Sequence, residues 1–223
     1  MWSEVLMTYA LIAHTPATLS ATLGAHTITV ILIAGAFIFG LSGGLAGALK
    51  GLDFFGVLVL AGVVGLSGGA LRDIFLGIPA VVIFDWRIVL SVLCSGVLAF
   101  FLYHPLQRWT NSIQIIDALG LSIFSVIGTD IALHHHAGAV ASAALGMLTG
   151  IGGGAVRDIV LREVPAVLQG GLYALPALFS SLVVVIGYET NHISLLWYSL
   201  AGLACLVLRL IGIFFDVNLP KAS

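Results

Sequence analysis

The sequence predicts an all-α integral membrane protein with seven transmembrane helices, arranged as two inverted three-helix repeats followed by a seventh helix. Hydrophobic residues make up 60% of the 223 residues and charged residues only 8%. Several apolar runs are long enough to span a bilayer, which takes about 20 residues. One glycine-rich motif occurs twice, 85 residues apart, as the difference between Arg72 and Arg157 shows.

Composition excludes several classes of protein. A soluble domain carries about a quarter charged residues, so most of this surface must face lipid. The formal net charge of -2, with scattered charges, excludes a nucleic-acid-binding surface. Cys94 and Cys205 lie within apolar runs and predict neither a disulfide nor a thiolate metal site. The chain lacks a nucleophile–base pair and a ligand cluster, so neither an enzyme nor a bound cofactor is expected.

The apolar runs divide the chain into seven expected spans. We place them at residues 27–49, 54–79, 88–103, 113–133, 137–161, 171–187 and 193–214. The expected organisation is an N-terminal arm (1–26), a first three-helix repeat (27–104), a second repeat (113–190), the seventh helix (193–214) and a tail (215–223).

The internal repeat covers a helix and the turn that follows it. Seven residues of the first copy are Gly65, Gly68, Gly69, Ala70, Arg72, Asp73 and Ile74. They recur as Gly150, Gly153, Gly154, Ala155, Arg157, Asp158 and Ile159. An odd number of spans in each copy makes the second copy enter the membrane from the opposite side, an arrangement common among transport proteins.

Short-loop cations predict the orientation. Lys50, Arg108, Arg162 and Lys221 would lie on one side of the membrane and Arg87 on the other. Because lysine and arginine accumulate in cytoplasmic loops, we expect the N-terminus outside and the C-terminus in the cytoplasm.

Glycines inside the second and fifth spans predict broken helices that line a polar pathway. Glycine weakens a helix interior, and unpaired backbone groups at membrane depth are tolerated only where protein or water receives them. Close helix packing is the other interpretation of such glycines. The candidate pathway residues are Ser67, Gly68, Gly69, Thr149, Gly152, Gly153 and Gly154.

The buried charges form the second group of candidates. Burying one charge at the bilayer centre costs roughly 3 kcal/mol, so Arg72, Asp73, Arg157 and Asp158 are expected to pair, unless the arginines snorkel to the headgroups. Asp117 either partners a buried arginine or acts at the helix start, and Leu32 occupies its place in the first repeat. Adjacent histidines point in different directions, so a metal site at 134–136 is not expected.

Four motifs together resemble the prokaryotic relatives of trimeric intracellular cation channels. They are Lys50-Gly51-Leu52-Asp53, the repeated Gly-Gly-Ala-x-Arg-Asp, Asp117-Ala118-x-Gly120-Leu121, and Glu163-Val164-Pro165. The resemblance implies a homotrimer in the lipid of the cell's inner membrane, with one pathway for K⁺ or Na⁺, chiefly potassium, in each protomer near the glycine-broken second and fifth helices. Some members are labelled glycine transporters. A secondary transporter for glycine or another small amino acid is therefore the alternative.

Overall fold

The structure is a computed structural model that describes residues 25–80, 84–106, 111–169, 171–192 and 194–217. Nearly all of the predicted arm and most of the tail lie outside the described residues. The described part contains seven α-helices and one 3₁₀ turn, η1 (Ala166–Leu168). The helices are α3 (Ala25–Leu49), α4 (Phe54–Leu76), α6 (Trp86–Leu106), α7 (Ser112–His134), α8 (Ala139–Val160), α9 (Ala174–Glu189) and α10 (Leu195–Phe214).

The predicted all-helical membrane fold is confirmed. Six of the described helices are long and apolar enough to cross a membrane, and the shorter apolar helix α9 has 16 residues. At 1.5 Å per residue, α9 rises about 24 Å, which is less than the roughly 30 Å hydrocarbon core. Each helix begins and ends within a few residues of the expected span.

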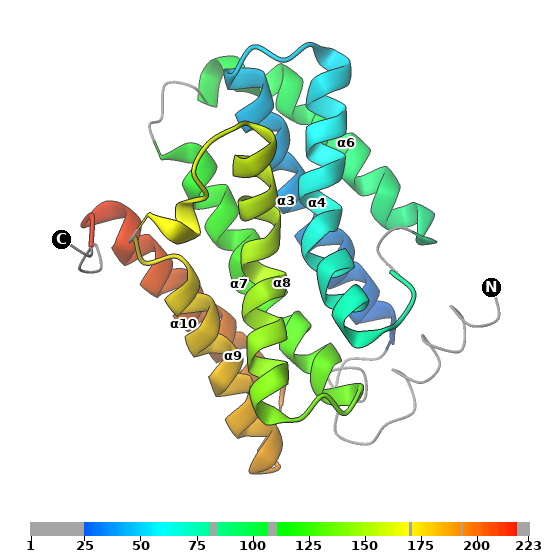
Figure 1. Cartoon of the computed structure of the whole chain (residues 1–223), viewed down its shortest axis with the longest axis vertical. Helices are drawn as coiled ribbons and strands as arrows, with labels where there is room; N and C mark the ends of the chain where they lie inside the picture. The colour runs from blue at the N-terminus through cyan, green and yellow to red at the C-terminus, as the bar shows by residue number, and fades with distance from the viewer. Residues whose placement is uncertain (1–24, 81–83, 107–110, 170, 193, 218–223) are drawn as a thin grey trace.

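The two three-helix units run in opposite directions through the bundle (Figure 1). The colour ramp shows that α3 and α7, the first helices of the two units, are antiparallel, as are α4 and α8. Phe39 of α3 stacks on Phe124 of α7 with ring centroids 5.2 Å apart. Their numbers also differ by 85. Equivalent residues of an inverted repeat meet only on its two-fold axis, so this stacked pair marks the axis.

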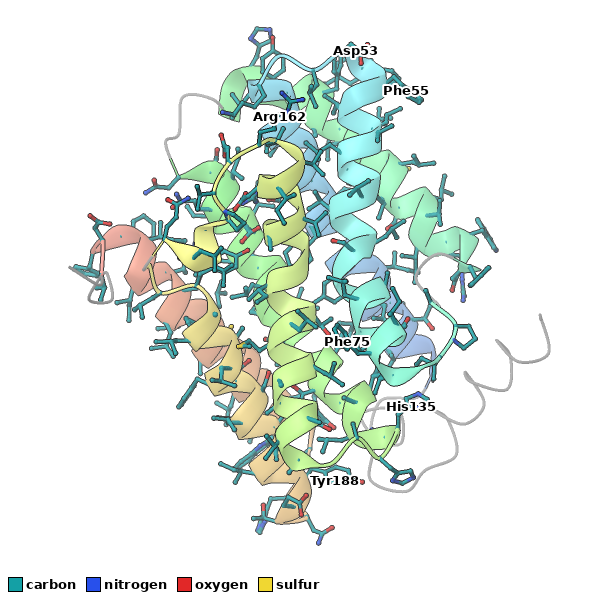
Figure 2. The ribbon with its side chains drawn as sticks, in the orientation of Figure 1. Asp53, Phe55, Phe75, His135, Arg162 and Tyr188 are labelled. Carbon is teal, nitrogen blue, oxygen red and sulfur yellow. The ribbon has the colours of Figure 1, made fainter. Side chains whose placement is uncertain are left out.

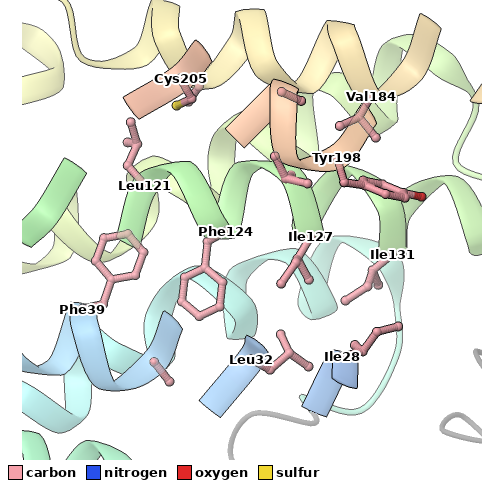
Figure 3. Close-up of a cluster of buried hydrophobic side chains, with 14 of the residues drawn as sticks. Ile28, Leu32, Phe39, Leu121, Phe124, Ile127, Ile131, Val184, Tyr198 and Cys205 are labelled. Atoms are coloured by element: carbon pink, nitrogen blue, oxygen red, sulfur yellow. The ribbon is translucent and has the colours of Figure 1, made fainter. Parts of the chain in front are cut away.

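Helix α7 lies at the centre of the hydrophobic core. Ile127 and Ile131 of α7 face Leu32 and Ile28 of α3, and the other side of α7 meets Tyr198 of α10 (Figure 3). Most residues of α7 from Asp117 onward are buried. The polar side chains of this helix from Asp117 onward are therefore shielded from lipid by protein.

Local signals set the ends of α4. The Asp53 carboxylate accepts a hydrogen bond of 2.7 Å from the Gly56 amide, which caps the N-terminus. Gly77 ends the helix in the left-handed region (φ 67°), and its amide bonds back to the Ile74 carbonyl. Asp53, part of the predicted loop motif, thus fixes where the second span starts.

The predicted breaks in the second and fifth spans are wrong. Helices α4 and α8 are continuous from Phe54 to Leu76 and from Ala139 to Val160. An unbroken helix satisfies its own backbone groups, which lipid cannot do. The close-packing interpretation of the glycines is the one that the structure supports.

These glycines let α4 and α8 cross backbone to backbone. A Cβ atom on Gly68 would lie 2.3 Å from the Thr149 carbonyl oxygen, and one on Gly153 would lie 3.0 Å from the Val64 carbonyl oxygen. The two contacts are equivalent, because both Gly68/Gly153 and Val64/Thr149 are separated by 85 residues. The crossing therefore obeys the same two-fold symmetry as the phenylalanine pair.

Candidate functional site: a buried charge network beside a polar cavity

The two Arg–Asp pairs lie near opposite ends of the bundle, because each follows the crossing point on one of two antiparallel helices (Figure 1). Arg72 is 2% exposed and Arg157 is 8% exposed. Both guanidinium groups are thus enclosed by protein. The alternative in which they snorkel to the headgroups does not describe this structure.

Arg157 is held by three residues from three helices. Its Nη1 donates to the Asp117 carboxylate of α7 and to the Ser42 hydroxyl of α3, each at 2.8 Å. Its Nε donates to Asp158 at 3.0 Å. Of the two predicted roles for Asp117, the arginine partner is the one observed. Asn111, rather than Asp117, stands at the start of α7.

A second layer of contacts fixes the carboxylates of this network. The Tyr173 hydroxyl donates to Asp117 at 2.7 Å, and the Ala166 amide donates to Asp158 at 2.8 Å. Arg209 of α10 lies over the Tyr173 ring, 4.6 Å from its centroid, and donates to the Leu172 carbonyl at 2.9 Å. The network therefore joins both repeats to the seventh helix.

Sequence reasoning missed Ser42, Tyr173 and Arg209. Arg209 carried a usable signal, since an arginine within a long apolar run is a functional candidate by default. Ser42 and Tyr173 carried none, because single hydroxyl groups are common in membrane helices. Only the folded chain brings Ser42 to the Arg157 guanidinium and Tyr173 to the Asp117 carboxylate.

A cavity of about 370 Å³ opens beside this network. Its wall includes Lys50 and Glu163, whose side chains form an exposed ion pair between the α3–α4 turn and the segment after α8. Figure 2 shows Asp53 and Arg162 at the same end of the bundle. The lining residues are Ala46, Leu49, Lys50, Ile113, Gln114, Asp117, Arg157, Asp158, Leu161, Glu163, Val164, Ala166, Gln169, Tyr173 and Arg209.

The Arg72 pair is simpler. Arg72 donates from Nε and Nη2 to one oxygen of Asp73, at 2.7 and 2.5 Å. Both side chains are almost fully buried. The remaining nitrogen, Nη1, has no hydrogen-bond partner in the part of the chain that the structure describes. The two ends of the protein thus differ, although the Arg–Asp motif is the same.

The predicted pathway residues lie on both sides of the α4–α8 crossing. Gly68, Gly69, Gly152, Gly153 and Gly154 are buried at or beside it. Ser67 instead lines an apolar groove with Leu93 of α6 and donates to the Val64 carbonyl at 3.2 Å. Thr149 is buried and donates to the Leu145 carbonyl at 2.6 Å. The two hydroxyl groups are not brought together.

The histidine run belongs to a different cluster at the other end of α7. His134 Nδ1 lies 2.6 Å from the Asp130 carbonyl oxygen, and the Tyr198 hydroxyl donates to the Asp130 carboxylate. Among the described residues, no group of three or more His, Cys, Asp or Glu side chains could hold a metal ion.

An all-helical, multi-pass membrane protein with inverted repeats and an internal charge network is typical of transport proteins. The family described as glycine transporter matches residues 29–104 and 114–189, one match for each unit. The inner membrane protein YadS of the UPF0126 group from Escherichia coli (strain K12) is 32% identical over 193 residues, covering 84% of this chain and 92% of that protein. The chain belongs to this family of inner-membrane proteins.

The chain is also similar to solved structures of cation channels. The orthologue of the trimeric intracellular cation (TRIC) channel from Rhodobacter sphaeroides has a TM-score of 0.81 and 30% identity, covering 86% of this chain and 99% of that one. A prokaryotic TRIC channel in 0.5 M KCl has a TM-score of 0.78 and 30% identity, covering 87% and 99%. A TRIC channel from C. elegans, at 12% identity and a TM-score of 0.60, shares the fold. These likenesses group the chain with channels rather than enzymes.

Proposed function

We propose that this protein is a monovalent cation channel, with potassium among its permeant ions and one pathway in each protomer of a homotrimer. The observation that carries the proposal is the polar cavity, which reaches a buried charge network beside the α4–α8 crossing. The solved channels that share this fold at 30% identity support the same class of function.

The pathway would continue from the cavity along the crossing of α4 and α8. Gly154 adjoins the Tyr173 hydroxyl and the Asp117 carboxylate, and its neighbour Gly153 is a crossing residue. The cavity therefore lies directly beside the helix crossing. With Gly68 packed on the Thr149 carbonyl, the crossing is closed, so conduction requires α4 and α8 to separate. Carbonyl oxygens exposed by that separation would replace part of the hydration shell of a cation.

The charges around the cavity are balanced in this arrangement. Lys50, Arg157 and Arg209 supply three positive charges, and Asp117, Asp158 and Glu163 supply three negative ones. Asp117 is bound to Arg157 and Glu163 to Lys50. Releasing the buried Asp117 carboxylate from Arg157 would give an entering ion a nearby negative charge where the local dielectric constant is low and the attraction is strong. Releasing Glu163 from Lys50 would add a negative charge at the exposed rim of the cavity.

Reconstitution into planar bilayers tests the proposal. In symmetric KCl, the purified protein should give unitary current steps that protein-free bilayers lack. Asp117→Asn should alter those steps or their frequency because it leaves Arg157 without its interhelical carboxylate. Glu163→Gln, a change in an exposed ion pair of the same cavity, is the matched comparison. Protein that purifies as a folded trimer but gives no steps, with ion flux into vesicles at background, would contradict a channel.

The family description favours one second candidate, a carrier of glycine or another small amino acid. Such a carrier would aim half-helix N-termini at the substrate carboxylate. Continuous α4 and α8 provide no such termini in this structure, which is why the channel is preferred. Saturable glycine counterflow without current steps would identify the carrier instead.

We further propose that the end of the bundle with the cavity faces the cytoplasm. Lys50 and Arg162 lie in the α3–α4 turn and just after α8, at the same end. Arg87 is near the start of α6, at the opposite end, where it forms a 2.7 Å ion pair with Asp85. Of these described loop cations, two lie at the cavity end and one at the other, in line with an inward placement of the cavity.

A further inference from the structure

The unfilled hydrogen-bonding capacity of Arg72 distinguishes the second end of the molecule. Its side chain is 2% exposed, and Asp73 accepts hydrogen bonds from Nε and Nη2 only. Within the described residues, Nη1 donates to nothing. A buried cationic donor that forms no hydrogen bond keeps its full desolvation penalty. The described residues provide no acceptor for Arg72 Nη1 at this end of α4.

The repeat shows which acceptors are missing. Arg157, the equivalent of Arg72, uses its Nη1 to bind Asp117 and Ser42. Subtracting or adding the offset of 85 turns these two positions into Leu32 and Ile127. Figure 3 shows Leu32 of α3 and Ile127 of α7 pointing toward one another in the core. Both acceptors of the second repeat are thus replaced by aliphatic side chains.

His135 contributes a second buried nitrogen without a hydrogen-bond partner among the described residues, near the end of α4 that carries Arg72. Its buried Nε2 has no hydrogen-bond partner in the described ranges. Figure 2 shows His135 near Phe75, at the end of α4 that carries Arg72. Burial, and then the nearby positive charge of Arg72, lower the pKa of His135. By the repeat offset His135 corresponds to Lys50, whose loop borders the cavity at the other end.

We propose that Arg72 is a binding residue for a small monocarboxylate, whose carboxylate takes the place that Asp117 holds in the other repeat. The protein itself supplies the precedent, since Arg157 binds an adjacent aspartate and a second carboxylate together. Asp73 already occupies the Nε edge, so the ligand binds through Nη1. That atom is covered by protein, so the ligand must be small, such as formate or glycine, and neighbouring side chains must move to admit it.

Leu32→Asp is the sharpest test, because it supplies in α3 the carboxylate that α7 supplies to Arg157. Wild type, Leu32→Asp and the volume-conserving control Leu32→Met are purified in detergent. Their Tm is measured as sodium formate replaces sodium chloride at constant sodium. The wild type and Leu32→Met should gain Tm saturably, by about 3 °C at a tenfold excess over Kd. Leu32→Asp should start higher and show no formate response.

Glycine and a second aspartate variant complete the experiment. Glycine, which leaves the ionic strength unchanged, separates an amino-acid ligand from a simple carboxylate: a response to both assigns the amino acid class, and a response to formate alone assigns the simple acid. If Leu32→Asp does not purify, Ile127→Asp offers the acceptor from α7. An unchanged wild-type Tm in formate, or equal responses of wild type and the aspartate variant, would overturn the site. The proposed cation conduction does not depend on either result.

Discussion

The backbone contact between α4 and α8 gives the most direct test of how this bundle is held together. In Gly68→Ala, the new methyl group would lie 2.3 Å from the Thr149 carbonyl oxygen. That oxygen belongs to a helix and cannot rotate away, so α4 must move by about 1 Å to reach an ordinary contact near 3.4 Å. Overpacking of this kind typically costs about 1–3 kcal/mol.

Gly62→Ala is the matched control on the same helix. A Cβ atom at Gly62 meets nothing within 4 Å, and alanine is the better helix former by about 1 kcal/mol. We expect Gly62→Ala to retain or slightly raise Tm and Gly68→Ala to lower it by several degrees, in thermal unfolding of the purified protein. Equal stability of the two variants would refute the close crossing and would restore a flexible break at Gly68 as the explanation of the motif.

Three further predictions concern charge. Asp158→Asn should lower stability by roughly 1.5–3 kcal/mol, because it removes one of the two carboxylates that bind the buried Arg157. Lys221→Gln on the tail should leave Tm and trimer yield unchanged, and a silent Asp158→Asn in unfolding assays would argue against the network. Reporter fusions should place the C-terminus in the cytoplasm, and a periplasmic signal would reverse the proposed orientation. Stability should fall as the pH is lowered from 8 toward 5, because His135 has a lowered pKa when folded and an ordinary one near 6.5 when unfolded. His135→Gln should reduce that loss in a pH series of Tm, and an unchanged series would contradict the role of His135.

The sequence was a good guide to the buried charges because their cost in lipid does not depend on the details of the fold. Arg72, Asp73, Arg157 and Asp158 had to be enclosed and paired, and the structure encloses and pairs them. The sequence alone left two roles open for Asp117. Its position near the start of a span suited a helix-start role as well as an ion pair, and only the arrangement of α7 against α8 decided between them.

The predicted helix breaks were wrong because consecutive glycines suit either a broken helix or a close helix crossing. Consecutive glycines lower helix propensity and also remove the Cβ atoms that keep helices apart. Lipid favours the second outcome, since a break would leave backbone groups unpaired. The tight contacts of Gly68 and Gly153 with opposing carbonyl oxygens show that the absence of side chains is used for packing.

The sequence by itself determined that the surface faces lipid, where the spans begin and end, and that the two repeats are inverted. Hydropathy, run length and residue spacing can all be read from the order of residues along the chain. Tertiary structure decided which residues share a site. Ser42, Tyr173 and Arg209 reach the Arg157–Asp117 pair from separate helices, and Arg72 is left with an unpartnered nitrogen within the described chain. A spacing of 85 residues predicts equivalent positions, but whether an acceptor stands opposite each arginine depends on side chains brought in from other helices.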